Sequence, residues 1–180
     1  MSPLSTSPSS FAFPLRALRL LGSGIQVLGL FAIAYALLFH VSVVRGSSMT
    51  PGIHDGDRIL VDHLSYVVGD VRRGDVVVLR CPLDQSLDYI KRVIGVPGDR
   101  IQIEDGRVLV NGAPVPEPYV LEPDRRCRVD EAVAPGHFFV LGDNREHSAD
   151  SREFGQVARG LLRGRVDLRV WPPERAGTVR

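Results

Sequence analysis

The pattern of apolar and polar positions divides the chain into two parts, and the first contains a long uncharged segment. Between Arg19 and Arg45 lie 25 residues without a formal charge, and Gln26 and His40 are the only strongly polar side chains among them. As a helix this segment would extend about 37 Å, enough to cross a hydrocarbon core of roughly 30 Å. No face of it is polar enough to meet water. The pattern predicts a transmembrane anchor at 20–44 behind a short cytoplasmic segment at 1–19.

A cleaved signal peptide is the main alternative for this segment. Arg16 and Arg19 precede the apolar run, and Ala32-Ile-Ala34 fits the small-residue pattern of a cleavage site. The run continues to Val44, however, so cleavage would leave an apolar tail on the mature protein. We therefore favour an uncleaved anchor. Arginines flank the segment on both sides, so charge alone barely discriminates its orientation.

After residue 44 the pattern changes to short apolar or alternating runs separated by Gly, Pro and Asp. Such runs are typical of β-strands, and no later stretch keeps a helical period. Strands are predicted at Arg58–Val61, Asp75–Leu79, Tyr89–Val96, His137–Leu141 and Val166–Trp171. The fold class that follows is mainly β: an all-β domain at 45–180 behind one N-terminal transmembrane helix.

Two glycine turns add detail to this β domain. Residues 101–110 predict a hairpin with Asp105-Gly106 in a two-residue turn of the mirror-image type, and Asn111-Gly112 supplies the next turn. Residues 111–135 contain five prolines. Proline cannot donate to a sheet ladder, so this region is expected to be rich in loops, with an edge ribbon as the alternative.

Charge and composition exclude some classes of protein. With 22 basic and 21 acidic residues the chain is nearly neutral, which gives no reason to expect a nucleic-acid partner. Cys81 and Cys127 are isolated from each other and from histidines at metal-ligand spacing. Neither a metal site nor a cofactor is therefore expected, whereas a disulfide between the two cysteines stays open.

One basic residue differs from the rest. Of the 22 basic residues, Lys91 is the single lysine. A compositional preference for arginine would explain this, but arginine keeps its proton near neutral pH whereas a buried lysine can lose it. Lys91 is also flanked by apolar residues, and on a strand it shares a face with Tyr89 and Val93 while Arg92 faces the other side. Burial there would lower the lysine pKa.

Three polar runs carry the candidate chemistry: Gly46-Ser-Ser-Met-Thr-Pro-Gly52, Tyr89-Ile-Lys-Arg-Val-Ile-Gly-Val-Pro-Gly-Asp99 and Leu141-Gly-Asp-Asn-Arg-Glu-His-Ser-Ala-Asp-Ser-Arg-Glu-Phe-Gly155. Ser48 in the first run needs a neighbouring base to become a nucleophile. Together with Gly74-Asp-Val-Val-Val78, the three runs resemble the conserved boxes of bacterial type I signal peptidases, both in their order along the chain and in their residues. The resemblance covers about residues 20–172. It implies that Ser48 is the nucleophile and Lys91 the general base.

The resemblance also implies supporting roles. Ser148 would donate to or accept from the lysine amine in a hydrogen bond. Asp150 and Arg152 would stabilise the loop around Ser148. Asp143 would shape the turn beside it, together with its neighbours Gly142 and Asn144. For Ser148 and Asp150 a purely structural role is a nearly equal alternative, because Ser and Asp in a Gly-Asp-Asn loop often only form the turn. For Asp143 a structural role is favoured over a catalytic one.

The activity implied is that of a membrane-bound serine endopeptidase. It would remove signal peptides from exported preproteins after A-x-A, through an acyl-enzyme, with its catalytic domain outside the cytoplasmic membrane. Its partners would be secretory preproteins and the lipid bilayer. Ser48 follows Val44 by four residues, which places it near the membrane surface, where a signal peptide presents its small residues. Met49 and Ile53 could line shallow pockets for those residues.

Two positions depart from the family pattern. Some members have a hydroxyl residue two positions before the nucleophile, which helps bind the oxyanion, and here that position is Gly46. The Ser48 backbone N–H is then the only donor expected. Before the loop serine the family commonly has Asn, and this chain has His147. An imidazole there could add a pH-sensitive contact near Lys91.

Three other functions are each compatible with part of the sequence. A Ser-His-Asp hydrolase could use His54, His63, His137 or His147 with Asp57 or Asp62, but no G-x-S-x-G elbow surrounds Ser48. A self-cleaving repressor protease shares the Ser/Lys arrangement, but DNA-binding helices are missing from the sequence. A non-catalytic, membrane-tethered β scaffold would not need an intact Ser48 and Lys91.

Overall fold

The computed structural model describes residues 25–30 and 39–179. The chain forms two compact units, Met1–Leu37 and Leu38–Arg180. Residues 25–30 are helical. None of the helices in these described ranges is both long and apolar enough to cross a membrane. The predicted cytoplasmic segment and most of the predicted anchor lie outside the described residues.

The predicted helix at 20–44 is wrong at its C-terminal end. Phe39–Val43 form strand β1, which pairs antiparallel with β2 (Arg58–Asp62). Val41 and Val43 are more than half exposed, and His40, Ser42 and Val43 line a cleft. Pairing with β2 satisfies the backbone groups that a helix would satisfy internally, and β-branched valines favour the extended chain.

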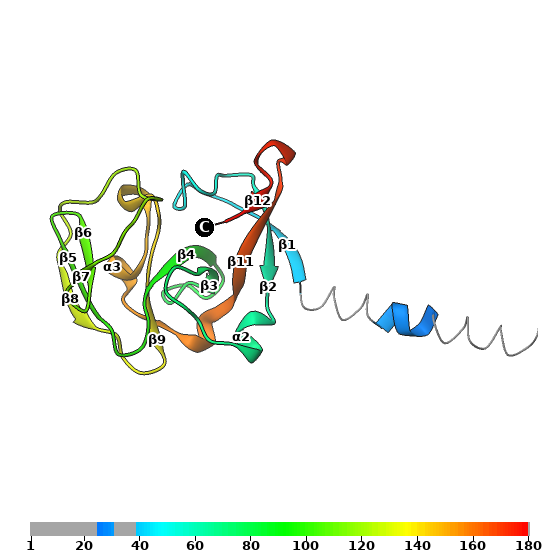
Figure 1. Ribbon diagram of the computed structural model, residues 1–180, viewed down its shortest axis with the longest axis horizontal. Coiled ribbons are helices and arrows are strands. Elements are labelled where there is room, and N and C mark those ends of the chain that lie inside the picture. Colours follow the sequence, from blue (N-terminus) through cyan, green and yellow to red (C-terminus); the bar gives the residue numbers. More distant parts are fainter. Residues whose placement is uncertain (1–24, 31–38, 180) are drawn as a thin grey trace, which may run out of the picture. The chain divides into compact units, whose positions relative to one another are not determined.

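An eight-stranded antiparallel sheet forms the main body of the second unit (Figure 1). Its order is β1-β2-β11-β3-β4-β9-β10, with β12 added on β11. The further strands are β3 (Val76–Arg80), β4 (Asp88–Gly95), β9 (His137–Leu141), β10 (Val157–Ala158), β11 (Leu162–Trp171) and β12 (Gly177–Thr178). All five predicted strands are confirmed, with boundaries shifted by a few residues. The first four residues of β3 are buried, consistent with its unbroken apolar run.

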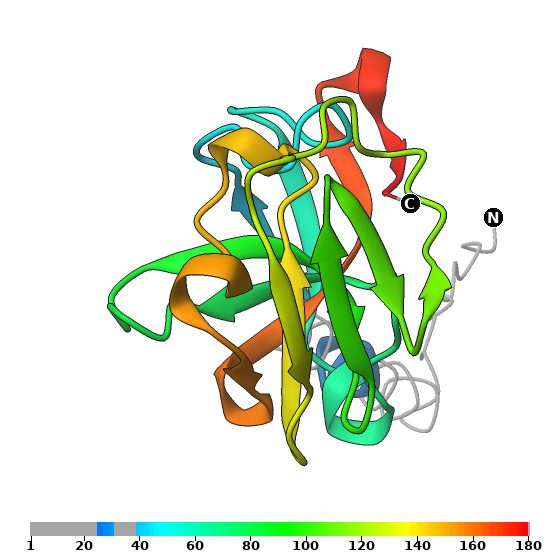
Figure 2. The ribbon, with the colours of Figure 1, turned by 90° about the vertical axis from the view of Figure 1, so that its left-hand side faces the viewer.

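A second sheet of four strands has the order β7-β6-β5-β8 and faces the viewer in Figure 2. Its strands are β5 (Arg100–Glu104), β6 (Arg107–Val110), β7 (Ala113–Pro114) and β8 (Val129–Ala132). The predicted hairpin is confirmed: Asp105 and Gly106 have φ of 48° and 78°, as the mirror-image turn requires. The proline-rich region is rich in loops, as predicted, since residues 115–128 form neither strand nor helix. It also contributes β7 and β8, the two edge strands of this sheet. Ile101 and Val110 pack with Phe139 of β9 and so join the two sheets.

Two short helices were not predicted. α2 (Ser65–Val68) and α3 (Ser151–Phe154) have four residues each, too few to show a helical period in the sequence. Asp150 caps α3 by accepting a hydrogen bond from the Arg152 N–H. Cys81 and Cys127 are free thiols in this structure, so the disulfide left open by the sequence is not formed.

Candidate active site

Ser48 lies in the loop that joins β1 to β2, and backbone hydrogen bonds hold that loop closed. The Val44 N–H donates to the Asp57 carbonyl at 2.8 Å, and the Gly56 N–H donates back to Val44 at 3.0 Å. Gly46 has a φ of +95°, which favours glycine, and its N–H donates to Asp55 Oδ1 at 2.7 Å. Ser48 is therefore carried on a fixed turn.

Asn144, in the third polar run (residues 141–155), also holds the loop that carries Ser48. Asn144 donates its backbone N–H to the Ser48 carbonyl at 3.0 Å. Its side-chain Nδ2 donates to the Ser47 carbonyl at 3.2 Å and to Thr50 Oγ1 at 3.0 Å. Residues almost a hundred positions apart in sequence thus fix the position of the Ser48 backbone.

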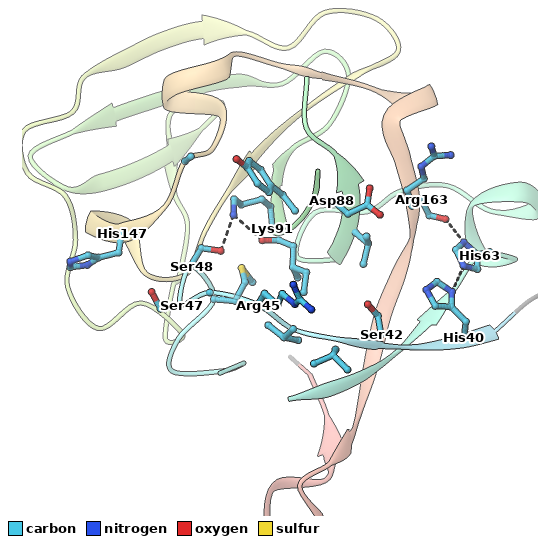
Figure 3. Close-up of a pocket in the computed structure, with 18 residues that line it drawn as sticks. His40, Ser42, Arg45, Ser47, Ser48, His63, Asp88, Lys91, His147 and Arg163 are labelled. Atoms are coloured by element: carbon cyan, nitrogen blue, oxygen red, sulfur yellow. Dashed lines mark hydrogen bonds between the residues drawn. The ribbon is translucent and has the colours of Figure 1, made fainter. Parts of the chain in front are cut away.

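Lys91 comes from β4 and points at Ser48 (Figure 3). Its Nζ lies 2.8 Å from Ser48 Oγ and also donates to the Ile90 carbonyl at 3.1 Å. The residue is only 3% exposed. Nζ sits 5.0 Å from the centre of the Tyr89 ring, as the alternation along the strand predicts. The structure therefore brings the sequence's two main candidates into direct contact.

Burial changes the protonation of this lysine. Removal from water disfavours the ammonium and lowers the pKa of Lys91 to about 8, although the carboxylates of Asp150 and Asp143 offset part of the effect. With that pKa, roughly one molecule in ten carries a neutral amine at pH 7, compared with about one in 2,500 for an unperturbed lysine. The amine can then accept a proton near neutral pH.

Arg92 points away from Lys91 but is buried as well. Its guanidinium makes a bidentate pair with Asp143, at 2.9 Å from Nε to Oδ1 and 2.7 Å from Nη2 to Oδ2. The two side chains are 3% and 1% exposed. The Tyr119 ring covers the guanidinium, with its centre 4.0 Å from Cζ. Asp143 thus links β4 to the turn that holds Ser48.

Asp150 and Arg152 form a second buried network at this turn. The Asp150 carboxylate is fully buried and accepts hydrogen bonds from the Gly142 N–H at 3.0 Å and from Arg152 Nη2 at 2.7 Å. Arg152 also donates to the Arg145 carbonyl at 2.6 Å and to Asp124 at 3.1 Å. The strand end at Gly142 is thereby tied to α3.

The expected hydrogen bond from Ser148 to Lys91 is not formed. Ser148 Oγ is buried and makes no hydrogen bond within the described part of the chain. The amine is directed instead to Ser48 and to the backbone carbonyl of Ile90. Ser148 packs against Gly142, and the absence of a Gly142 side chain makes this approach possible.

Gly142→Ala should disrupt the site. A Cβ at position 142 would lie 2.2 Å from Ser148 Oγ and 2.6 Å from the Ser48 carbonyl oxygen, so the loop carrying the nucleophile must move. A misplacement of about 1 Å can lower activity on the order of a hundredfold. The matched control is Gly160→Ala, where an added Cβ meets nothing within 4 Å. Equal peptide cleavage by both variants would contradict the tight contact at Gly142.

None of the five histidines, all within the described ranges, hydrogen-bonds to Ser48. His54 contacts Arg175, His63 contacts His40 and the Arg163 carbonyl, and His137 contacts the Pro135 carbonyl. His147 lies beside the cleft, with Nδ1 3.4 Å from Asn144 Oδ1. Asp57, a proposed orienter, is engaged by Arg175. This geometry does not support a Ser-His-Asp mechanism.

A cleft of about 450 Å³ opens beside Ser48 and Lys91. The apolar part of its lining consists of Val44, Met49, Val78 and Ile90, and Gly46 lines the cleft as well. Figure 3 shows Arg45 and Ser42 between Ser48 and His40. Ile53 is fully buried in the core beneath it. The far end of the cleft contains polar residues that sequence reasoning missed: His40, His63, Asp88 and Arg163. The alternation of His40 and Ser42 with valines was the available signal.

The chain is similar in sequence to known signal peptidases. A family model described as signal peptidase, peptidase S26, matches residues 17–171. Signal peptidase I of Bacillus caldolyticus is 41% identical over 75% of this chain and 81% of its own length. Signal peptidase I of Leptolyngbya laminosa is 38% identical over 87% of this chain and 82% of its own length. A crystal structure of a signal peptidase I from Enterococcus faecalis is 28% identical, covers 54% of this chain and 97% of that one, and gives a TM-score of 0.47.

Proposed function

Since the chain belongs to the S26 signal peptidase family, we propose that it is a membrane-anchored serine endopeptidase that removes signal peptides after A-x-A with Ser48 and Lys91. The observation that carries the proposal is the 2.8 Å contact between Lys91 Nζ and Ser48 Oγ. Burial of the amine supports its role as a base, because a neutral amine can take the hydroxyl proton.

The chemistry follows from these two groups. Neutral Lys91 accepts the Ser48 proton as Oγ attacks the carbonyl carbon of the scissile bond. The resulting ammonium donates a proton to the leaving amine, which leaves an acyl-enzyme on Ser48. Lys91, neutral again, then activates a water that hydrolyses the ester. The Ser48 N–H donates to no group in the ranges that the structure describes, so it is available to the oxyanion. Gly46 offers no hydroxyl for this purpose.

The cleft suits an extended peptide. In the part of the chain that the structure describes, residues 40–43 of β1 pair with β2 alone, and in β4 the pairing with β9 begins at Arg92. The outer edges of residues 40–43 and 88–91 both border the cleft. A peptide between them could form backbone hydrogen bonds as an added strand. Small side chains at −1 and −3 would fit the apolar part of the cleft beside Met49.

The supporting residues would act by holding the backbone of the site in place. Asp143 with Arg92, and Asp150 with Arg152, fix the turn on which Asn144 holds the Ser48 backbone. Neither carboxylate hydrogen-bonds to Ser48 or Lys91 in the described ranges. We assign them no direct part in the reaction.

The uncharged segment before β1 would anchor the enzyme in the cytoplasmic membrane, with the β domain on the extracytoplasmic side. Secretory preproteins and the bilayer are then its partners. Protease added to intact spheroplasts should digest the chain from Arg45 onward. An N-terminus at Tyr35 in the purified protein would show instead that the segment is a cleaved signal peptide.

The activity itself is tested with a synthetic signal peptide that ends in A-x-A. The full-length protein in detergent should cleave after the second alanine, as mass spectrometry of both products would show. Ser48→Ala should abolish cleavage. Equal cleavage by wild type and Ser48→Ala, or none by either, would refute the proposal.

The pH dependence of cleavage is a further prediction. Because only neutral Lys91 can act as base, and its neutral fraction increases with pH, kcat/KM should rise with pH, reach half of its maximum at about pH 8 and level off roughly one unit higher. His147 lines the cleft and is the competing explanation for an ascending limb. His147→Asn should therefore leave the midpoint unchanged. Loss of the limb in this variant would assign it to the histidine.

A further inference from the structure

One end of the cleft is polar and takes no part in the proposed chemistry. It is lined by His40 at the start of β1, Asp88 at the start of β4, Arg163 in β11, and His63, which follows β2. Figure 3 shows these residues on the opposite side of Ser48 from His147. Four separate elements therefore build this end.

The hydrogen bonds of the two histidines indicate which ring nitrogens accept when both rings are neutral. His63 Nδ1 lies 2.6 Å from the Arg163 carbonyl oxygen and must donate to it, because a carbonyl only accepts. In neutral His63 the other nitrogen, Nε2, accepts, and it lies 2.6 Å from His40 Nδ1. His40 Nδ1 then carries the proton, so His40 Nε2 has a lone pair. The Asp88 carboxylate adds a second acceptor.

The strand directions place this end relative to a bound substrate. β1 and β4 are separated by four antiparallel pairings, β1-β2, β2-β11, β11-β3 and β3-β4, so they run in the same direction. Both start at the polar end. In the proposed function the anchor precedes β1, and the substrate's apolar segment lies in the same bilayer. The residues before the scissile bond would then enter the cleft from the polar end.

Strand periodicity identifies the substrate position. Side chains two residues apart share a face, so −1, −3 and −5 of an extended peptide point the same way. The first two would occupy the apolar part of the cleft, where Val44 and Ile90 lie. The single step from −3 to −5 leads from Ile90 to Asp88 on β4, and the two steps from −1 to −5 lead from Val44 to His40 on β1. The −5 side chain would therefore meet the polar end.

We propose that His40 and Asp88 form a subsite for the −5 residue of the signal peptide, and that this subsite selects a neutral hydrogen-bond donor such as glutamine. The inference rests on the proposed function. His40 Nε2 and the Asp88 carboxylate are both hydrogen-bond acceptors, so the −5 side chain has to be a donor. Asp88 repels a carboxylate but attracts a cation, and Arg45 and Arg163, which also line the cleft, do the reverse, so the charges at this end do not select an ion of either sign. A leucine would leave these polar groups dehydrated and unpaired.

The test compares four peptides of one A-x-A sequence, with Gln or Leu at −5 and, separately, at −4. With the full-length enzyme in detergent, kcat/KM should be about fivefold higher for Gln than for Leu at −5, the effect of one hydrogen bond. At −4, which points to the other face, the two should differ by less than about twofold. His40→Phe and Asp88→Ala should each bring the −5 ratio close to 1. His137→Phe, a histidine outside the cleft, should keep it.

The possible results separate the subsite from the proposed function. Equal cleavage of the Gln and Leu peptides at −5 would overturn the subsite while leaving the peptidase activity in place. A Gln preference of the same size at −4 would overturn it too, since no strand-like alternation would exist. If no peptide were cleaved, the proposed function would fail and the subsite with it.

Discussion

Lys91→Arg should lower kcat/KM by at least about a thousandfold while the protein stays folded. The substitution keeps the positive charge, but a guanidinium cannot release its proton near neutral pH and so cannot accept one from Ser48. General-base catalysis accounts for roughly 10² to 10⁴ in rate, and here the same amine would also protonate the leaving group. The measurement is cleavage of the A-x-A peptide at pH 8, with circular dichroism to verify folding. Activity within about tenfold of wild type would show that Lys91 is not the base.

Lys91→Met is the matched variant because it is close to lysine in size and has no charge. It should be as inactive as Lys91→Arg but more stable than wild type. Between pH 8 and 10.5 the folded protein binds fewer protons than the unfolded chain, so Lys91 makes wild-type stability rise with pH over this window. Below pH 8 the buried lysine lowers the free energy of unfolding by up to about 3 kcal/mol, and replacing it with methionine removes this cost. The gain in unfolding temperature should therefore be largest near pH 7 and shrink toward pH 10.

Asp143→Ala should destabilise the domain by about 3–5 kcal/mol, because it leaves the Arg92 cation buried without its partner. For a chain of this size that corresponds to a decrease in unfolding temperature of roughly 6–20 °C. Peptide cleavage should fall as well, since the turn that holds the Ser48 backbone depends on Asp143. Thermal unfolding of the full chain in detergent measures the first effect.

The control is a pair with the same geometry at the surface. Arg100 and Asp130 also form a bidentate contact, at 2.8 and 2.9 Å, but their side chains are 63% and 48% exposed. Asp130→Ala should leave the unfolding temperature nearly unchanged, because water replaces the lost partner. A double variant, Arg92→Met with Asp143→Leu, should recover much of the stability lost in Asp143→Ala. Equal effects of Asp143→Ala and Asp130→Ala would contradict the role of burial.

The sequence predicted most of the strands from their apolar patterns, and it predicted the pairing of Ser48 with Lys91 by a different route. Alternation along β4 correctly placed Lys91 beside Tyr89 and Arg92 on the opposite side. That Ser48 meets Lys91 could not be derived from periodicity, because the two lie 43 residues apart. Their contact depends on the β1–β2 loop folding over β4. Only the resemblance of the motifs supplied that pairing in advance.

Other features depended on tertiary structure that a local pattern does not contain. Residues 39–43 look like the end of an apolar helix, yet they form a strand because β2 offers a pairing edge. Ser148 was expected to bond the lysine, yet its hydroxyl is held away from the amine beside Gly142. The polar end of the cleft assembles His40, His63 and Asp88 from three elements, and no sequence window contains all three.

The pKa of the Lys91 amine tests the central claim most directly, and the composition makes it accessible. Lys91 is the single lysine among the 22 basic residues, so protein grown with ¹³C-labelled lysine gives one Cε resonance to follow through a pH titration. Burial beside Ser48 predicts a midpoint at about 8 that coincides with the ascending limb of kcat/KM. A midpoint near 10.4, the value of an exposed lysine, would contradict a neutral general base.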